Sequence, residues 1–212
     1  MGGRGLSARR WGVLGGVFDP VHYAHLVIAE QARETLELDR VLFVPVGNPA
    51  HREAPRAAAE ARVEMVASAI EGNPSFALSR LEVDREGASY TVDTAQWLVE
   101  RHPGTGFVFI LSAESVSYLP EWREPERLLD LSEIAIVPRL GYADIPLEWL
   151  RTHFPGREER FSFVRTSHLG HSSSDIRARL EAGRSIRYLV PPAVEAYIGE
   201  HGLYGSDHRS AA

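Results

Sequence analysis

The chain has 212 residues, 44% of them hydrophobic, and a formal net charge of -6 at pH 7. This length and composition can bury one sizeable core, so we expect a single domain over residues 11–204, between a flexible leader at 1–10 and a flexible tail at 205–212. The negative charge argues against nonspecific binding to nucleic acid or acidic membranes, because such binding depends on clustered cations.

Cysteine is absent, which excludes disulfides, thiolate nucleophiles and zinc sites with sulfur ligands. The first apolar stretch is interrupted by Gly15, Gly16 and Asp19, so we do not expect a signal peptide. No run approaches the roughly 18 apolar residues of a membrane span. These features predict a cytoplasmic protein with no membrane partner, and they leave open whether it forms a homo-oligomer.

Short apolar runs alternate with longer segments of helical spacing. Runs rich in Val, Ile and Phe predict strands at 11–15, 41–46, 76–83, 107–113, 133–139 and 161–165. Helical patterns lie at 24–37, 57–71, 91–102 and 146–153. This alternation is typical of βαβ units, so we expect a Rossmann-like α/β fold with an open, mostly parallel sheet and helices on both faces. The alternating pattern of 76–83 predicts an edge strand.

Two further helices are predicted near the end of the chain, as a small C-terminal helical extension. A serine of the run 172–174 can cap the first helix, and Gly183 can end it. Pro191 and Pro192 suit the first turn of the second helix.

The stretch GGVFDPVHYAH (15–25) leaves the first predicted strand and enters the first predicted helix. Gly15 and Gly16 allow a sharp turn or a close approach of the backbone to a ligand. The helix directs its free amides and positive dipole end to the same place, which favours an anion there. His22 and His25 can both face that anion as donors. The pattern fits a metal less well, because the usual helical histidine pair is four residues apart and no third ligand is evident.

Polar residues also follow later strands. NPAHR (48–52) follows the second predicted strand, and SAES (112–115) follows a later one. Ligands of parallel sheets bind at the carboxyl ends of strands, so we expect these loops at the same rim as the two histidines. HSSSDIR (171–177) places serines at a helix N-terminus and Arg177 about one turn later, a combination that can hold phosphate oxygens. The arginine of NPAHR also suits a dianionic phosphate.

GGVFDPVHYAHL and HSSSDIR together resemble the two motifs of the nucleotidyltransferase superfamily, whose H-x-G-H element binds a nucleoside triphosphate. NPAHR, SYTVDT (89–94), FILSAES and LPEW (119–122) resemble the nicotinate-nucleotide adenylyltransferase family within it. The resemblance covers nearly the whole chain. It implies an enzyme of NAD biosynthesis that joins nicotinate mononucleotide to ATP, supplied with Mg²⁺, and releases nicotinate adenine dinucleotide and pyrophosphate.

The resemblance also implies site residues. His22 and His25 are expected to be catalytic, stabilising charge on the phosphates without acting as a general base. The implied ATP ligands are Gly15, Gly16, Phe18, His22, His25, Glu114, Ser172, Ser173 and Arg177. The implied mononucleotide ligands are His51, Arg52, Thr91, near the nicotinate carboxylate, and Trp122, stacked on the pyridine ring. Magnesium is expected to be held mainly by phosphates, so no metal ligand is assigned.

Three positions depart from the family pattern. Ala24 stands for the glycine between the histidines, Ser112 for another glycine, and Glu114 for an aspartate on the adenosine side. Two alternatives stay open. One is a related adenylyl- or cytidylyltransferase with another acceptor, such as nicotinamide mononucleotide or phosphopantetheine; Thr91 and Trp122 would be idle if that acceptor has no pyridine ring. The other is a non-catalytic nucleotide-binding protein whose site has drifted.

Overall fold

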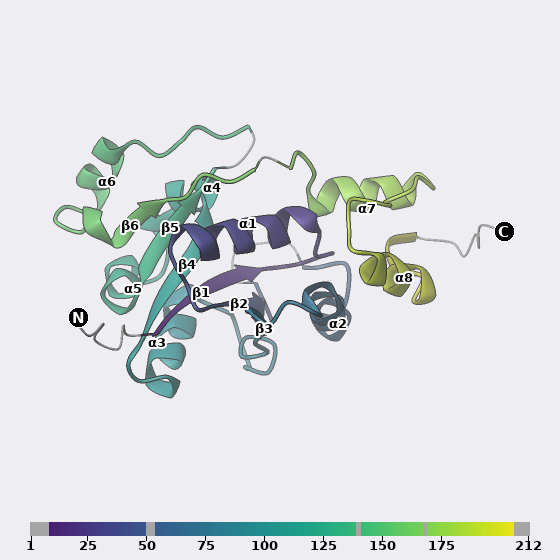
Figure 1. Ribbon diagram of the computed structural model, residues 1–212, viewed down its shortest axis with the longest axis horizontal. Coiled ribbons are helices and arrows are strands. Elements are labelled where there is room, and N and C mark those ends of the chain that lie inside the picture. The colour runs from purple at the N-terminus through teal and green to yellow at the C-terminus, as the bar shows by residue number, and fades with distance from the viewer. Residues whose placement is uncertain (1–8, 50–53, 139–140, 168, 206–212) are drawn as a thin grey trace, which may run out of the picture. The chain divides into compact units, whose positions relative to one another are not determined.

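The computed structural model describes residues 9–49, 54–138, 141–167 and 169–205 (Figure 1). Six strands form one sheet in the order β3-β2-β1-β4-β5-β6. The pairs β1–β4, β4–β5 and β5–β6 are parallel. The predicted Rossmann-like α/β class is therefore confirmed. The strands are β1 (Arg9–Gly16), β2 (Arg40–Pro45), β3 (Phe76–Leu78), β4 (Thr105–Ser112), β5 (Glu133–Val137) and β6 (Phe161–Phe163).

The helices include all those that the sequence predicts and several short ones that it does not. They are α1 (Tyr23–Thr35), α2 (Ala59–Ile70), α3 (Thr91–Arg101), α4 (Ala113–Ser117), α5 (Pro125–Leu131), α6 (Leu147–His153), α7 (Ser173–Glu181) and α8 (Pro192–Glu200), with 3-10 turns η1 (Leu119–Glu121), η2 (Glu158–Arg160) and η3 (Leu203–Gly205). The unpredicted α4 and α5 are too short to give a clear helical period in the sequence. Within the described ranges, no helix is long and apolar enough to cross a membrane.

The chain divides into two compact units. Unit 1 contains the described parts of Met1–Leu14, Ala29–Leu42 and Tyr90–Thr166. In its strand β4, residues 107–110 are all buried, and in β5 residues 134–137 are buried too. Successive side chains of a strand point to opposite faces, so both faces of this part of the sheet are covered, as the sequence predicts.

Unit 2 contains Gly15–Ile28, Phe43–Ser89 and the described part of Ser167–Ala212. Its α2 contacts both β3 and α8. The predicted helical extension is formed by α7 and α8, drawn in yellow-green in Figure 1. Ser172 caps α7, and Gly183 follows the helix with a φ of 63°. The predicted start and stop signals of α7 are therefore confirmed.

The expected domain limits stay a prediction. Most of the expected leader and tail lies outside the described residues. Two residues of the expected leader, Arg9 and Arg10, belong to β1, and Gly205 of the expected tail belongs to η3.

The predicted edge strand at 76–83 lies at the edge of the sheet but ends early. Only residues 76–78 form β3, because the chain then turns, with the Asp84 amide donating to the Arg80 carbonyl at 2.9 Å. This turn brings the Glu82 carbonyl against the loop that follows β2. A Cβ atom on Gly47 would lie 2.0 Å from that carbonyl oxygen, so only glycine fits there.

We predict that Gly47→Ala destabilises the protein by roughly 3 kcal/mol, because the new methyl overlaps backbone that cannot rotate away. Chemical denaturation would measure the change. Gly199→Ala is the matched control: its Cβ would meet nothing within 4 Å inside α8, so it should stabilise the protein by about 0.5 kcal/mol or leave it unchanged. An equal free energy of unfolding for both variants would contradict the steric argument.

Candidate active site

We call residues 15–25 the histidine loop. β1 ends at Gly16 and α1 begins at Tyr23, as the sequence predicts. His22 is the residue that precedes the first turn of α1, and His25 is the third residue of the helix. The strand-to-helix connection therefore places both imidazoles at the N-terminal end of α1.

The two imidazoles pack against each other. Their ring centroids lie 3.8 Å apart with planes inclined by 30°. The backbone N–H of His22 donates to Nδ1 of His25 at 3.3 Å. Because a backbone N–H can only donate, Nδ1 of His25 carries no hydrogen, and the neutral ring holds its proton on Nε2. His25 thus caps α1 with one ring nitrogen and offers a donor at the other.

The backbone amides at the start of α1 are already bonded. The His22 amide binds His25, the Tyr23 amide donates to the Leu189 carbonyl at 3.1 Å, and the His25 amide donates to the His22 carbonyl at 3.0 Å. These three amides are therefore not the free donors that the sequence led us to expect. An anion here would be attracted by the imidazoles and the helix dipole.

Phe18 supports the imidazoles from within the fold. Its side chain is 2% exposed, and its ring meets that of His25 edge-on at a centroid distance of 5.0 Å. A Cβ on Gly16 would lie 3.2 Å from the Phe18 ring. The glycine thus makes room for the aromatic ring, whereas Gly15 is exposed with open space around its Cα. Ala24 is buried in the first turn of α1.

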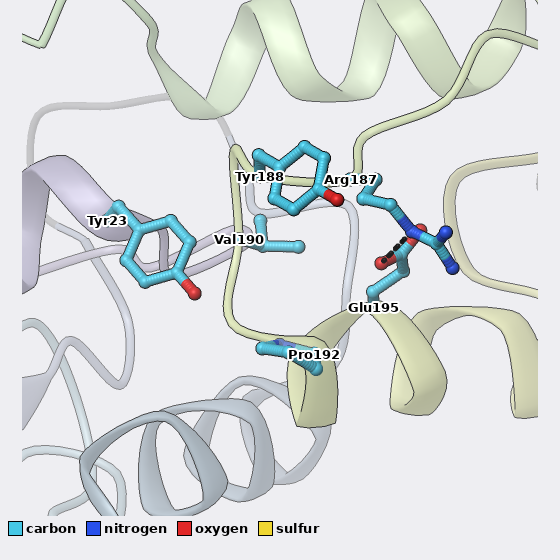
Figure 2. Close-up of a pocket in the computed structure, with 6 residues that line it drawn as sticks. All are labelled: Tyr23, Arg187, Tyr188, Val190, Pro192 and Glu195. Carbon is cyan, nitrogen blue, oxygen red and sulfur yellow. Dashed lines mark ion pairs between the residues drawn. The ribbon is translucent and has the colours of Figure 1, made fainter.

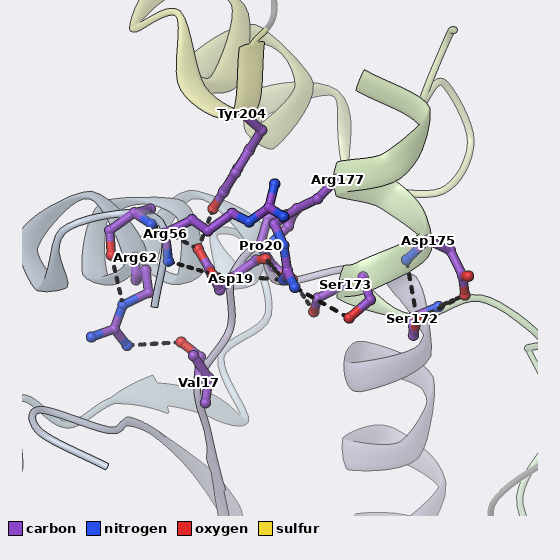
Figure 3. A network of polar contacts seen from close by, with 12 residues as sticks. Val17, Asp19, Pro20, Arg56, Arg62, Ser172, Ser173, Asp175, Arg177 and Tyr204 are labelled. Carbon is purple, nitrogen blue, oxygen red and sulfur yellow. Dashed lines mark hydrogen bonds and ion pairs between the residues drawn. The ribbon is translucent and has the colours of Figure 1, made fainter. Parts of the chain in front are cut away.

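Asp19 gathers several segments of unit 2 around one carboxylate (Figure 3). It is 4% exposed. Its oxygens accept hydrogen bonds from the Arg56 amide at 2.9 Å, the Ala57 amide at 3.0 Å and the Tyr204 hydroxyl at 2.7 Å. The Arg177 guanidinium lies 3.6 Å from the carboxylate and donates to the Asp19 carbonyl at 2.7 Å.

Arg62 reinforces the same connection from α2. Its guanidinium donates to the Val17 carbonyl at 2.8 Å and to the Ala57 carbonyl at 3.3 Å, in a side chain that is 1% exposed. Burial lowers the pKa of this guanidinium, and Asp19 partly offsets the effect. We call the following residues the Asp19 network: Asp19, Arg56, Ala57, Arg62, Arg177 and Tyr204.

The serines of the second motif are bonded within the protein. Ser172 exchanges hydrogen bonds with Asp175, which also lowers the pKa of that carboxyl. The Ser173 hydroxyl donates to the Pro20 carbonyl at 2.9 Å, and Arg177 also donates to the Ser174 hydroxyl at 3.2 Å. To bind phosphate, these donors would have to exchange their present acceptors for phosphate oxygens.

His171 lies beside the histidine pair, and the sequence analysis did not select it as a candidate. Its ring meets that of His22 edge-on at 5.1 Å. Burial lowers the pKa of this imidazole, against a smaller opposing effect of its hydrogen bond to the Leu189 backbone. Nε2 of His171 has no hydrogen-bond partner among the described residues. Its position as the first residue of HSSSDIR was the available signal.

The remaining predicted residues that the structure describes lie in unit 1. Ser112 caps α4, and the Glu114 carboxylate accepts a hydrogen bond from the Tyr142 hydroxyl at 2.6 Å. Thr91 is the first residue of α3, and Trp122 is half-buried directly after η1.

The segments that carry Thr91 and Trp122 contact each other. Arg123 lies over the Tyr90 ring at 4.8 Å and 3.5 Å from the Asp93 carboxylate. His51 and Arg52, the predicted phosphate ligands of the acceptor, lie outside the described residues.

A cavity of about 230 Å³ lies beside the start of α1 in unit 2 (Figure 2). It is lined by Tyr23, Arg187, Tyr188, Val190, Pro192 and Glu195. None of the predicted site residues within the described ranges lines it. Among the residues that the structure describes, no group of three or more His, Asp or Glu is placed to hold a metal ion.

Acidification is predicted to weaken the fold through His171. Its folded pKa lies below the ordinary value of about 6.5, so the unfolded chain takes up a proton at higher pH than the folded chain. The stability that comes from the neutral ring is complete above that value and is lost as the pH falls towards the folded pKa. His171→Asn keeps a donor for Leu189 but does not titrate. Between about pH 7.5 and pH 5.5, the Tm of the unchanged protein should fall further than that of the variant. Equal losses would contradict this role.

Comparison with known proteins assigns this chain to a family. The family described as cytidylyltransferase-like matches residues 13–179. The chain is 44% identical to a probable nicotinate-nucleotide adenylyltransferase of Thermus thermophilus, over 92% of this chain and 99% of that protein. It is 39% identical to the protein of the same name from Thermomicrobium roseum, over 92% of this chain and 91% of that protein.

A solved structure shares the fold. Plasmodium falciparum nicotinic acid mononucleotide adenylyltransferase complexed with NaAD superposes with a TM-score of 0.78 at 21% identity, over 94% of this chain and 98% of that chain. The family match covers both the histidine loop and the second motif. The chain therefore belongs to the cytidylyltransferase-like family, among relatives that are named nicotinate-nucleotide adenylyltransferase.

Proposed function

We propose that this protein is a nicotinate-nucleotide adenylyltransferase. It joins nicotinate mononucleotide to ATP and forms nicotinate adenine dinucleotide and pyrophosphate. The observation that carries the proposal is the His22–His25 pair, which presents an imidazole donor at the start of α1 in a chain about 40% identical to relatives of that name. The cytoplasm remains the expected location of the protein.

The reaction needs no covalent intermediate on the protein. A phosphate oxygen of the mononucleotide attacks the α-phosphorus of ATP, a new P–O bond forms, and the bond from that phosphorus to the bridging oxygen of pyrophosphate breaks. The electron pair of the broken bond leaves with pyrophosphate. Catalysis then consists of in-line positioning and stabilisation of the negative charge on the transferring and departing groups.

The two histidines would supply that stabilisation. Nε2 of His25 holds a proton in the neutral ring because Nδ1 accepts from the backbone, so it donates to a phosphate oxygen without first being protonated. His22 packs against His25, meets the His171 ring edge-on and would present the second imidazole. Neither ring is needed as a base, since the attacking phosphate is already ionised. Magnesium would enter as part of the ATP substrate, held mainly by its phosphates.

The other substrate contacts belong to the same proposal. Gly15, Gly16, Phe18, Glu114, Ser172, Ser173 and Arg177 are proposed on the ATP side, and His51, Arg52, Thr91 and Trp122 on the mononucleotide side. The Tyr90–Arg123 contact supports the acceptor assignment, because it joins the segments that carry Thr91 and Trp122. Phe18 would act through His25, since its own ring is buried.

We predict that pyrophosphate is released from ATP with nicotinate mononucleotide at least about tenfold faster than with nicotinamide mononucleotide. The reason is that the proposed acceptor site recognises a carboxylate. A coupled pyrophosphate assay with both acceptors and phosphopantetheine would measure the rates. Equal rates with the two mononucleotides would overturn the acid preference, and activity with phosphopantetheine alone would move the protein to another transferase class. Binding of ATP without turnover of any acceptor would support the non-catalytic alternative.

We predict that His25→Ala lowers turnover at least about tenfold, equivalent to about 1.4 kcal/mol of activation free energy. This variant also removes the cap on the His22 amide, so it should lose about 1 kcal/mol of stability. His25→Asn separates the two effects, because its side-chain oxygen can accept from the His22 amide but no donor remains at the position of Nε2. Steady-state kinetics and thermal unfolding should therefore show low turnover for both variants and lower stability for the alanine variant. Wild-type turnover in His25→Asn would refute the phosphate role.

A further inference from the structure

Tyr204 has an unusual conformation for a residue near the end of the described chain. Its φ is 59° and its ψ is 28°, inside the turn η3. This left-handed conformation is energetically unfavourable for any residue that carries a Cβ atom. A residue other than glycine keeps it only where its surroundings hold it in place. The Tyr204 hydroxyl reaches a carboxylate 185 positions earlier in the chain, on Asp19, at 2.7 Å.

The Asp19 carboxylate connects the histidine loop to other segments of unit 2 through hydrogen bonds. Phe18, directly before Asp19, is also in the left-handed region, with a φ of 52°. Two backbone amides, those of Arg56 and Ala57, bind the same carboxylate. Figure 3 shows the Tyr204 hydroxyl pointing at Asp19, with Arg56 beside the same residue. A buried carboxylate with these fixed donors holds one orientation.

Tyr204 stays a donor at ordinary pH. Burial raises the pKa of its phenol far above the usual value, and the hydrogen bond to Asp19 raises it further. The hydroxyl therefore remains protonated, and Asp19 remains the acceptor.

The hydrogen bonds between Asp19 and the 56–57 segment lie close in sequence to the proposed phosphate ligands of both substrates. His22 is three residues after Asp19, and Arg52 is four residues before Arg56. Arg177, proposed on the ATP side, also donates to the Asp19 backbone. An in-line reaction requires the two phosphates in one alignment, and small misplacements reduce its rate strongly.

We propose that Tyr204 is a positioning residue for the transfer reaction: through Asp19 it fixes the histidine loop against the 56–57 segment. The kinetic part of this inference depends on the proposed function. The structural part does not.

Tyr204→Phe removes one hydroxyl and keeps the ring. We expect kcat to fall about tenfold, with a smaller change in KM for ATP, because the histidines act on the transition state. In a background that carries both His22→Ala and His25→Ala, the same change should lower kcat less than about twofold, since both imidazoles that Tyr204 positions are already gone. If the two effects multiply instead, Tyr204 does not act through the histidine loop, and the proposal fails.

Hydrogen exchange supplies a readout that needs no activity. In Tyr204→Phe, amide exchange should become faster in residues 15–25 and 54–58 and stay unchanged in α3. Unchanged exchange in the histidine loop, or a uniform increase over all segments, would overturn the proposal. If the unchanged protein shows no adenylyl transfer, the proposed function fails and exchange alone decides the role of Tyr204.

The matched control is Tyr197→Phe. Tyr197 is a half-buried tyrosine of α8, and its ring stacks on His201 at a centroid distance of 4.0 Å, outside the Asp19 network. Removal of its hydroxyl should leave kcat and exchange in 15–25 unchanged. Equal effects of the two substitutions would show that loss of a tyrosine hydroxyl in this unit is harmful in general, which contradicts a specific role for Tyr204.

Discussion

The buried carboxylate of Asp19 is the constraint on which the geometry of the histidine loop depends. A buried carboxylate must be compensated, and unit 2 compensates this one with two backbone amides, a tyrosine hydroxyl and a nearby guanidinium. Each of these donors comes from a chain segment far from Asp19 in the sequence. Satisfying one charge therefore assembles the loop, the 56–57 segment, α7 and η3 in one arrangement.

The imidazole of His25 serves two purposes. His25 uses Nδ1 to cap α1, and this use leaves its proton on Nε2. A structural hydrogen bond thus selects the tautomer that would donate to phosphate in the proposed reaction. In the proposed reaction the imidazoles would take the role that free helix amides were expected to play, because the amides of His22, Tyr23 and His25 are bonded within the protein. Phosphate recognition at this helix terminus would rest on side chains more than on backbone.

The fold follows from patterns that are local in the sequence. Alternating apolar and amphipathic segments predict the strands and the long helices, and the serine run and Gly183 predict both ends of α7. The Asp19–Tyr204 contact has no such pattern, because its partners are 185 positions apart. Arg62 sits in a helical pattern where an arginine would be expected at the surface, yet it is buried because two carbonyls receive its donors. The need for glycine at 47 depends on a carbonyl that only the folded turn at Glu82 brings near.

The proposed function depends most on contact between the histidine loop and the phosphates of ATP. The most direct measurement is a crystal structure with a non-hydrolysable ATP analogue and Mg²⁺. We predict that Nε2 of His25 lies within about 3.2 Å of a phosphate oxygen, with Nδ1 still accepting from the His22 amide. An analogue bound with its phosphates away from both imidazoles would contradict this account.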